Sequence, residues 1–348
     1  MCIRDSMKKI LLILISINIS AIHADMERVD MLFDKEERHY FVYIPKEQSN
    51  QTDKIVIGLH GYTGSATGFE METTGGFNNS AEKYNFIAVY PQGSYFYEQK
   101  LERGKISSEY ISSWNDLTGS KTKTPFGETC AEDAVVYPKY PNCIGTDAGR
   151  CAWTSCGDDM GFIKQIIDDV KKRFDLKKIY VVGMSNGGKM AHALACEFSK
   201  DISGVINVVG SPQNGLACEP KTPINYIIYA GAEDKVVPPF NVVSFDKYFY
   251  TPVSTLVNKW TTSFNCKKKE FLTNIEFDNI KEQIYSDCDD GVRIVSLLNT
   301  EQGHSWPGTE EYMGFCRTKY QTEIDLEPCS NTINEWGNDF LLQRLFSQ

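Results

Sequence analysis

The chain has 348 residues, with 36 basic and 46 acidic side chains and a formal net charge of −10. An acidic chain without a basic tract repels phosphate backbones, which argues against nucleic acid as a partner. After residue 24 there is no uninterrupted apolar run of eighteen residues, so we expect the mature chain to be soluble and outside the membrane.

Residues 1–24 are predicted to comprise a few upstream residues and a secretory signal peptide. Lys8 and Lys9 form a charged start, residues 10–15 form an apolar run, and residues 21–24 are a plausible cleavage end. The apolar run is too short for a membrane span, with an uncleaved anchor as the alternative. We expect residues 25–348 to form a single domain, secreted or periplasmic, and a monomer.

Apolar runs alternate with helical patterns along the rest of the chain. The runs predicted as strands are residues 39–44, 55–59, 86–90, 179–183, 205–209, 226–230 and 292–298. The middle runs are apolar throughout, which is typical of parallel strands covered on both faces. Helical spacing of apolar residues marks a helix after Asp158 and Asp159 and a closing helix over 331–346. This alternation predicts an α/β fold with a mostly parallel sheet and helices on both faces.

Two segments interrupt this alternation and are expected to form the rim or lid of a pocket. Residues 100–157 are loop-like and rich in charged, Gly, Pro and Cys residues, and residues 240–265 contain aromatics and a helical stretch. Insertions at the carboxyl ends of strands commonly shape pockets. Asp158 and Asp159 are interpreted as helix caps, with metal binding as the alternative.

Ten of the eleven cysteines follow residue 24, and an even number in a secreted chain indicates disulfides. Pairs between near neighbours would be Cys196–Cys218, Cys266–Cys288 and Cys316–Cys329. The other four cysteines, at positions 130, 143, 151 and 156, would staple the first insertion. A zinc site is the alternative for these four, although no histidine lies near them.

The most informative motif is Gly183-Met184-Ser185-Asn186-Gly187, which lies between a predicted strand and a predicted helix. A G-x-S-x-G in this context is the nucleophile elbow of α/β-hydrolases, where a tight turn exposes the serine hydroxyl. The expected chain order of the catalytic residues is serine, then acid, then histidine.

Of five histidines, only His304 follows a candidate acid, and it lies in a loop after an apolar strand. His60 is expected to shape its loop, and His192 to point away along the helix after Ser185. Asp234 ends a strand at a glycine turn and is chosen over Glu233 as the orienting carboxylate. Asp246 and Asp290 are weaker candidates because neither follows such a strand.

The oxyanion of a tetrahedral intermediate needs hydrogen-bond donors. We expect one from the backbone N–H of Asn186 and the other from Tyr62 or Thr63, with Tyr62 preferred. Trp306 and Trp153 are candidate stacking surfaces for substrate, and a core position is the alternative for both. No metal or organic cofactor is required.

Several motifs occur in order: residues 59–62 (LHGY), 90–93 (YPQG), 158–163 (DDMGFI), 183–188 (GMSNGG), 194–196 (LAC) and 303–308 (GHSWPG). The set resembles the polyhydroxybutyrate depolymerase/feruloyl esterase family of secreted α/β-hydrolases over roughly residues 36–348. The resemblance implies an extracellular serine esterase, with Ser185, Asp234 and His304 as its triad. The insertion at 130–156 departs from the shorter bacterial members and leaves the pocket rim, and hence the substrate, open.

The sequence therefore predicts a serine carboxylic-ester hydrolase that acts through an acyl-enzyme. The expected substrates are polymer-derived: feruloyl or acetyl esters on plant polysaccharide, or polyhydroxybutyrate-type esters. Two alternatives are a serine peptidase of the same fold and a non-catalytic exported binding protein on a hydrolase scaffold. Such binding proteins usually lose a triad member, and here all three are present.

Overall fold

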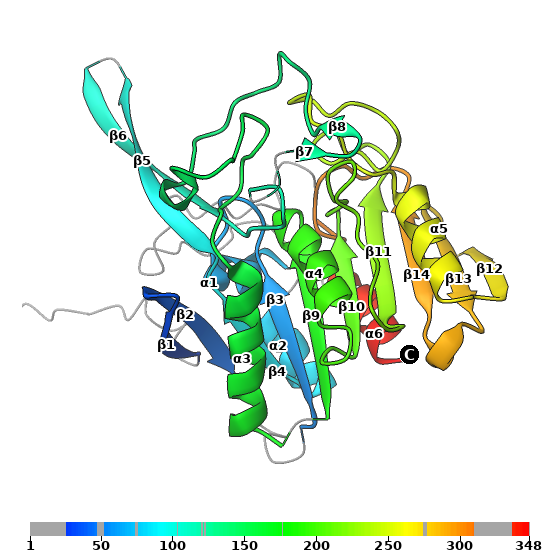
Figure 1. Cartoon of the computed structure of the whole chain (residues 1–348). Helices are drawn as coiled ribbons and strands as arrows, with labels where there is room; N and C mark the ends of the chain where they lie inside the picture. The colour runs from blue at the N-terminus through cyan, green and yellow to red at the C-terminus, as the bar shows by residue number, and fades with distance from the viewer. Residues whose placement is uncertain are drawn as a thin grey trace, which may run out of the picture.

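The computed structural model describes residues 26–46, 52–73, 76–102, 104–119, 121, 123–175, 177–273, 277–309 and 336–347 (Figure 1). The predicted signal segment and the predicted pair Cys316–Cys329 lie outside these residues. Within the described ranges, none of the helices combines the length and apolar character needed to cross a bilayer.

A ten-stranded sheet forms the centre of the molecule. Its strands are β1 (Glu27–Phe33), β2 (Glu36–Tyr43), β3 (Lys54–Leu59), β4 (Ile87–Pro91), β9 (Lys178–Met184), β10 (Gly204–Val208), β11 (Asn225–Gly231), β12 (Lys268–Thr273), β13 (Ile280–Ser286) and β14 (Ile294–Asn299). In space they follow the order β1-β2-β4-β3-β9-β10-β11-β14-β13-β12. Six strands that are consecutive in this spatial order run parallel: β4, β3, β9, β10, β11 and β14. Two antiparallel strands border them on each side. The predicted α/β architecture with a mostly parallel sheet is confirmed.

All seven predicted strands are present, as β2, β3, β4, β9, β10, β11 and β14. Strands β1, β12 and β13, which lie at or next to the sheet edges, were not predicted. The residues of β1 are half-buried or exposed, and in β13 exposed or half-buried residues interrupt the buried ones. A search for continuous apolar runs finds strands that are buried on both faces and misses such edge strands.

Residues 100–157 are not wholly loop-like, which corrects the prediction. Strands β5 (Ser94–Glu102) and β6 (Lys105–Ser113) form a hairpin that stands out from the body of the molecule (Figure 1). Further along lie the short strands β7 (Lys123–Thr124) and β8 (Gly127–Glu128) and a 3₁₀ turn at Pro141–Cys143. The hairpin was missed because its side chains are mostly polar and exposed, so no apolar run marks it.

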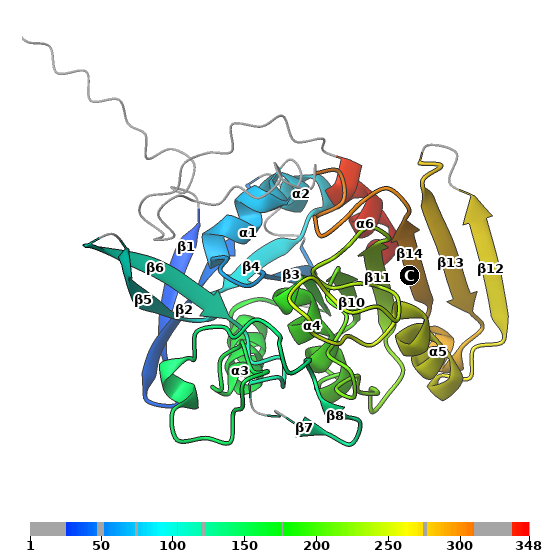
Figure 2. The ribbon, with the colours of Figure 1, turned by 90° about the horizontal axis from the view of Figure 1, so that it is seen from above.

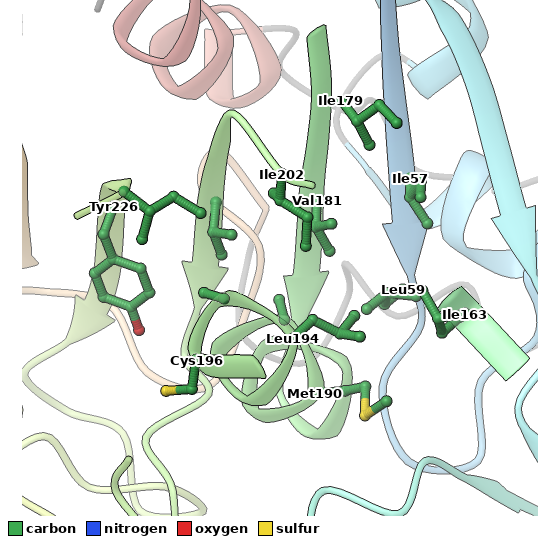
Figure 3. Packing of buried hydrophobic residues seen from close by; sticks show 14 of the residues in the cluster. Ile57, Leu59, Ile163, Ile179, Val181, Met190, Leu194, Cys196, Ile202 and Tyr226 are labelled. Carbon is green, nitrogen blue, oxygen red and sulfur yellow. The ribbon is translucent and has the colours of Figure 1, made fainter. Parts of the chain in front are cut away.

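Helices cover both faces of the sheet. One face carries α3 (Asp159–Arg173), α4 (Asn186–Glu197) and α5 (Val253–Ser263), and the other carries α1 (Ala66–Glu72), α2 (Phe77–Tyr84) and α6 (Trp336–Phe346) (Figure 2). Figure 3 shows how Met190 and Leu194 of α4 pack against Leu59 and Val181 of the sheet. Burial of this apolar surface from both sides is the main source of fold stability.

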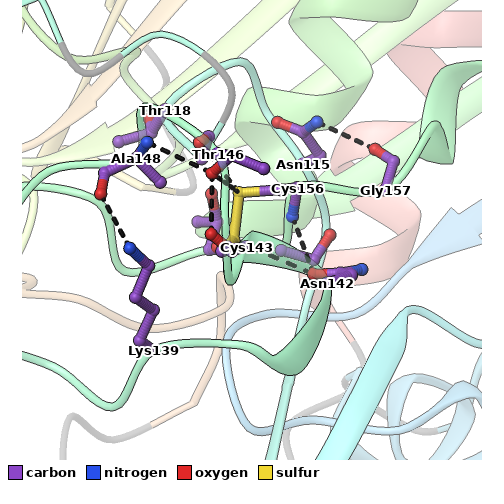
Figure 4. Close-up of a disulfide and its surroundings, with 12 residues drawn as sticks. Asn115, Thr118, Lys139, Asn142, Cys143, Thr146, Ala148, Cys156 and Gly157 are labelled. Carbon is purple, nitrogen blue, oxygen red and sulfur yellow. Dashed lines mark hydrogen bonds between the residues drawn. A yellow bond between two sulfur atoms is a disulfide. The ribbon is translucent and has the colours of Figure 1, made fainter.

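Four disulfides lie within the described residues, and they agree with the part of the predicted scheme that falls there. Cys196–Cys218 and Cys266–Cys288 are the predicted neighbours, and the first insertion is stapled by Cys130–Cys151 and Cys143–Cys156. These sulfur atoms are therefore not available as zinc ligands. Around Cys143–Cys156, the Cys156 N–H donates to Asn142 and the Asn115 amide donates to the Gly157 carbonyl (Figure 4).

The two aspartates before α3 have different roles. Asp158 is the N-cap, and its carboxylate accepts from the N–H of Gly161 at 2.9 Å, as predicted. Asp159 is buried and forms an ion pair with Arg38 at 2.8 Å. It also accepts from the backbone N–H of Asn115 and from the hydroxyl of Ser155. Asp159 therefore anchors the insertion to β2 rather than acting as a helix cap.

Candidate active site

Ser185 lies in a sharp turn between β9 and α4. Its φ of 55° and ψ of −117° are a backbone conformation that residues with a side chain rarely adopt. The turn can close because Gly183 and Gly187 have no Cβ atom. A Cβ atom at Gly183 would collide with the backbone of Gly187, and one at Gly187 would collide with the carbonyl oxygens of Leu59 and His60. The two motif glycines are thus required by close backbone approach, which is what a nucleophile elbow needs.

The structure brings Ser185, His304 and Asp234 into one chain of hydrogen bonds. His304 Nε2 lies 2.9 Å from Ser185 Oγ, and His304 Nδ1 lies 2.8 Å from Asp234 Oδ2. The three residues follow β9, β14 and β11, whose carboxyl ends meet at one edge of the sheet. All three are buried, with at most 9% of the residue exposed, so the relay is shielded from bulk water.

Backbone hydrogen bonds fix the orientation of the Asp234 carboxylate relative to His304. Its Oδ1 accepts the backbone N–H groups of Val236 and Val237, each at 2.8 Å, which leaves Oδ2 for the imidazole. The Glu233 N–H donates to the Gln302 carbonyl at 3.0 Å, which ties the loop of the acid to the loop of the histidine. The alternative acid Asp246 instead accepts from the hydroxyl of Tyr137.

Two further histidines, His60 and His192, make hydrogen bonds or ring contacts outside this chain of hydrogen bonds. His60 is fully buried, its Nε2 accepts from the Gly93 N–H at 3.0 Å, and burial lowers its pKa to about 4. His192 stacks on Trp260, and burial lowers its pKa to about 3. Both imidazoles are therefore neutral near pH 7, and His60 has the loop-shaping role that was predicted for it.

The loop after β3 lies directly beside the nucleophile, since a Cβ atom at Gly61 would sit 3.5 Å from the Cβ atom of Ser185. The Thr63 N–H donates to the Ser112 carbonyl at 2.8 Å and is therefore occupied. This leaves Tyr62 as the better of the two expected donors. Asn186 is the first residue of α4, where a helix leaves backbone N–H groups without intrahelical partners.

The two candidate stacking residues are both buried. Trp306 is 2% exposed, packs edge-on against Phe69 and donates its indole N–H to Asn338. Trp306 therefore belongs to the core, and this placement does not support a substrate-stacking role. Trp153 is 7% exposed and packs edge-on against Tyr62, with ring centroids 5.1 Å apart. Trp153 therefore packs behind the loop after β3 that carries Tyr62, which we name the oxyanion loop because Tyr62 is the expected donor.

Three residues near the site were not identified from sequence: Trp114 and Lys189, which are buried, and Gln302, which is half-buried. Trp114 contacts both His60 and Asn186, and Gln302 donates to the hydroxyl of Ser305 beside the histidine. The ammonium group of Lys189 lies 4.4 Å from the ring centre of Trp153 and 3.9 Å from the Asp116 carboxylate. Burial lowers the pKa of Lys189 to about 8, and the Asp116 charge acts in the opposite direction. Only the tertiary fold reveals these contacts.

No family model matches the chain. NocK of Nocardia uniformis subsp. tsuyamanensis, which is provisionally named an esterase, is 26% identical over 170 residues. That match covers 43% of this chain and 49% of NocK, so the chain spans about half the length of this curated relative.

Solved structures give a longer match. Acetyl xylan esterase from Aspergillus awamori aligns with a TM-score of 0.51 at 14% identity, covering 81% of this chain and 94% of that one. S-formylglutathione hydrolase from Agrobacterium tumefaciens aligns with a TM-score of 0.46 at 12% identity, covering 80% of this chain and 88% of that one. Together with the strand order and the elbow, the likeness to the acetyl xylan esterase shows that the chain has the α/β-hydrolase fold.

Proposed function

We propose that the protein is a serine carboxylic-ester hydrolase that works through an acyl-enzyme. The observation that carries this proposal is the buried relay from Ser185 through His304 to Asp234, with hydrogen-bond distances of 2.9 and 2.8 Å. Esterase is also the activity in the names of NocK and of the acetyl xylan esterase.

In the first half-reaction, Ser185 Oγ attacks the ester carbonyl carbon while His304 Nε2 accepts the hydroxyl proton. Asp234 holds the imidazole in the correct tautomer and stabilises the imidazolium that forms. The N–H groups of Asn186 and Tyr62 stabilise the oxyanion, and His304 then gives its proton to the departing alcohol. Water repeats the sequence on the acyl-enzyme, releasing the acid and restoring the serine.

The rim near the acid favours polymer-derived esters. The segment after Asp234 exposes Phe240, Val242, Val243 and Phe245. It is hydrogen-bonded to the first insertion, where the Val135 N–H donates to the Asp246 carbonyl at 3.1 Å. Contiguous exposed apolar side chains beside a catalytic site are suited to contact with an extended apolar substrate. Feruloyl, acetyl-xylan and polyhydroxybutyrate-type esters all remain within this proposal.

Export is part of the proposal, and the four disulfides support it because they persist in oxidising compartments. We infer a secreted or periplasmic protein that needs no metal or organic cofactor for this chemistry. Its partner would be the ester substrate alone.

A substrate panel tests the proposal. Purified protein should hydrolyse at least one of methyl ferulate, acetylated xylan and hydroxybutyrate oligomers, and Ser185→Ala should lower kcat by about 10⁶-fold, as serine removal does in serine hydrolases. Matched aryl esters and anilides distinguish the peptidase alternative, since an esterase cleaves only the ester. Ester hydrolysis unchanged in Ser185→Ala would refute the catalytic assignment.

A further inference from the structure

Trp114, the residue after β6, contacts both the nucleophile elbow and the oxyanion loop. We propose that Trp114 and the side chain of Asn186 are positioning residues that set the separation of the two oxyanion donors. This inference rests on the proposed function, because it assigns a role within the same ester-cleaving site.

The first contact fixes the donor on α4. The Trp114 backbone N–H donates to Asn186 Oδ1 at 2.7 Å, and Asn186 Nδ2 donates back to the Trp114 carbonyl at 3.1 Å. Asn186 Nδ2 also donates to Asp116 at 3.1 Å. Asn186 and Trp114 are both 0% exposed. The side chain of Asn186 is therefore held at both ends, and its own backbone N–H is the expected donor.

The second contact fixes the donor on the loop after β3. The Trp114 indole N–H donates to the His60 carbonyl at 2.9 Å, two residues before Tyr62. The Trp114 ring also lies 4.8 Å from the His60 ring, centre to centre. On the far side of Tyr62, the Thr63 N–H donates to the Ser112 carbonyl. Residues 112–114 therefore hold the loop by hydrogen bonds on both sides of Tyr62.

This arrangement places one rigid segment between two donors that come from distant parts of the chain. Oxyanion stabilisation depends on donors that are already in place when the charge develops, and misplacement by about 1 Å can cost about 100-fold in rate. No contact of Trp114 with the reacting atoms is needed for such an effect. The hydrogen bonds of Trp114 hold both donors in place, because breaking one would leave a buried polar group unpaired at a cost in free energy.

Two variants test the proposal separately. Asn186→Ala removes the amide clamp and keeps the backbone N–H, and Trp114→Phe keeps an aromatic ring and removes the indole donor. Each variant should lower kcat by about 10- to 100-fold with KM nearly unchanged. If one of them fails to fold, the other still decides the question.

A second readout separates positioning from a general structural effect. An alkyl trifluoromethyl ketone adds to a serine hydroxyl and forms a stable tetrahedral oxyanion. Its inhibition constant should rise by the same factor as kcat/KM falls, while the affinity for the ground-state acid product stays unchanged. Unchanged ketone affinity, or a higher KM at constant kcat, would overturn the proposal.

Trp260→Phe is the matched control. Trp260 is also 0% exposed, and its indole N–H donates to the Cys218 carbonyl at the same distance of 2.9 Å. It packs under α4 on His192, away from the oxyanion loop. Its loss should lower the melting temperature as Trp114→Phe does and leave kcat unchanged. Equal kcat losses in the two variants would contradict the assignment, whereas inactive wild-type protein would instead refute the proposed function.

Discussion

At the scale of single residues, Asp234 shows how the fold prepares one carboxylate for one task. Two backbone N–H groups occupy Oδ1, so only Oδ2 faces the histidine. An aspartate that merely closed a turn would not need this division. The geometry therefore separates Asp234 from Asp246, whose carboxylate accepts from Tyr137 and Ser244.

Asp234→Asn should lower kcat by about 10⁴-fold while the protein stays folded. An amide at this position can accept from the two backbone N–H groups only by turning its NH₂ towards His304. The imidazole would then be held in the wrong tautomer and could not accept the serine proton. Steady-state kinetics with an aryl ester, alongside circular dichroism of the variant, measure this effect. An active Asp234→Asn variant would contradict the assignment of this acid.

The three residues that the structure brings together could be chosen from sequence because chain order and scarcity restricted the choice. Ser185 stood in a strand–turn–helix motif, and His304 was the one histidine after a candidate acid. Prediction was weaker where the role of a residue depends on the direction in which its side chain points. Trp306 lies two residues from His304, yet its ring turns into the core against Phe69. Spacing along a loop does not determine which way a side chain points.

At the scale of elements, the first insertion packs against the loop that carries Tyr62. Trp153 packs against Tyr62 and belongs to the same buried cluster as Cys130 and Cys151. The disulfide between these cysteines therefore connects the outer insertion to a proposed oxyanion donor.

Replacing Cys130 and Cys151 together by serine should lower both stability and activity. Opening a loop of sequence separation 21 is expected to cost about 3 kcal/mol in the free energy of unfolding. A looser Trp153 should also lower kcat/KM, which aryl-ester kinetics at a temperature where the variant stays folded will show.

The matched control is the same double replacement at Cys266 and Cys288. That loop has a sequence separation of 22, so the expected loss of stability is nearly equal. The bond lies just before β14 begins, at the end of the parallel strands opposite Ser185. Activity should survive there, and equal activity losses in both variants would contradict a supporting role for the insertion.

Elements buried on both faces were predictable because continuous apolar runs mark them, as in β9 and β10. The β5–β6 hairpin was not, because its pairing depends on register between polar strands rather than on burial. Helices α1 and α2 are short, with 7 and 8 residues, and gave no clear periodic signal.

At the scale of the whole molecule, buried titratable groups make stability depend on pH. Burial lowers the pKa of His60 and His192, so the unfolded chain binds more protons there and stability falls as the pH drops below about 6.5. Glu70 acts in the opposite direction. Burial raises its pKa from 4.5 to about 7, although its carboxylate accepts from the Asn78 N–H. Its contribution is present below pH 4.5 and is lost as the pH rises through 7.

Glu70→Gln should therefore stabilise the protein at pH 8 and have little effect at pH 4.5. The difference from wild type should reach at most about 3 kcal/mol, because a shift of one pKa unit corresponds to about 1.4 kcal/mol. Glutamine keeps an oxygen that can accept from the Asn78 N–H. Urea unfolding of both proteins from pH 4.5 to 8 measures this difference and cancels the histidine contributions. A difference that does not change with pH would contradict the burial of an ionisable Glu70.

The central claim is that Ser185 forms an acyl-enzyme. Rapid mixing of the protein with excess p-nitrophenyl acetate, followed by mass spectrometry of the quenched protein, tests it most directly. An acyl-enzyme on Ser185 should give a burst of one equivalent of p-nitrophenol and an acetyl group on the peptide that contains Ser185, both absent in Ser185→Ala. An acetyl group on another residue, or hydrolysis by Ser185→Ala at the wild-type rate, would contradict the claim.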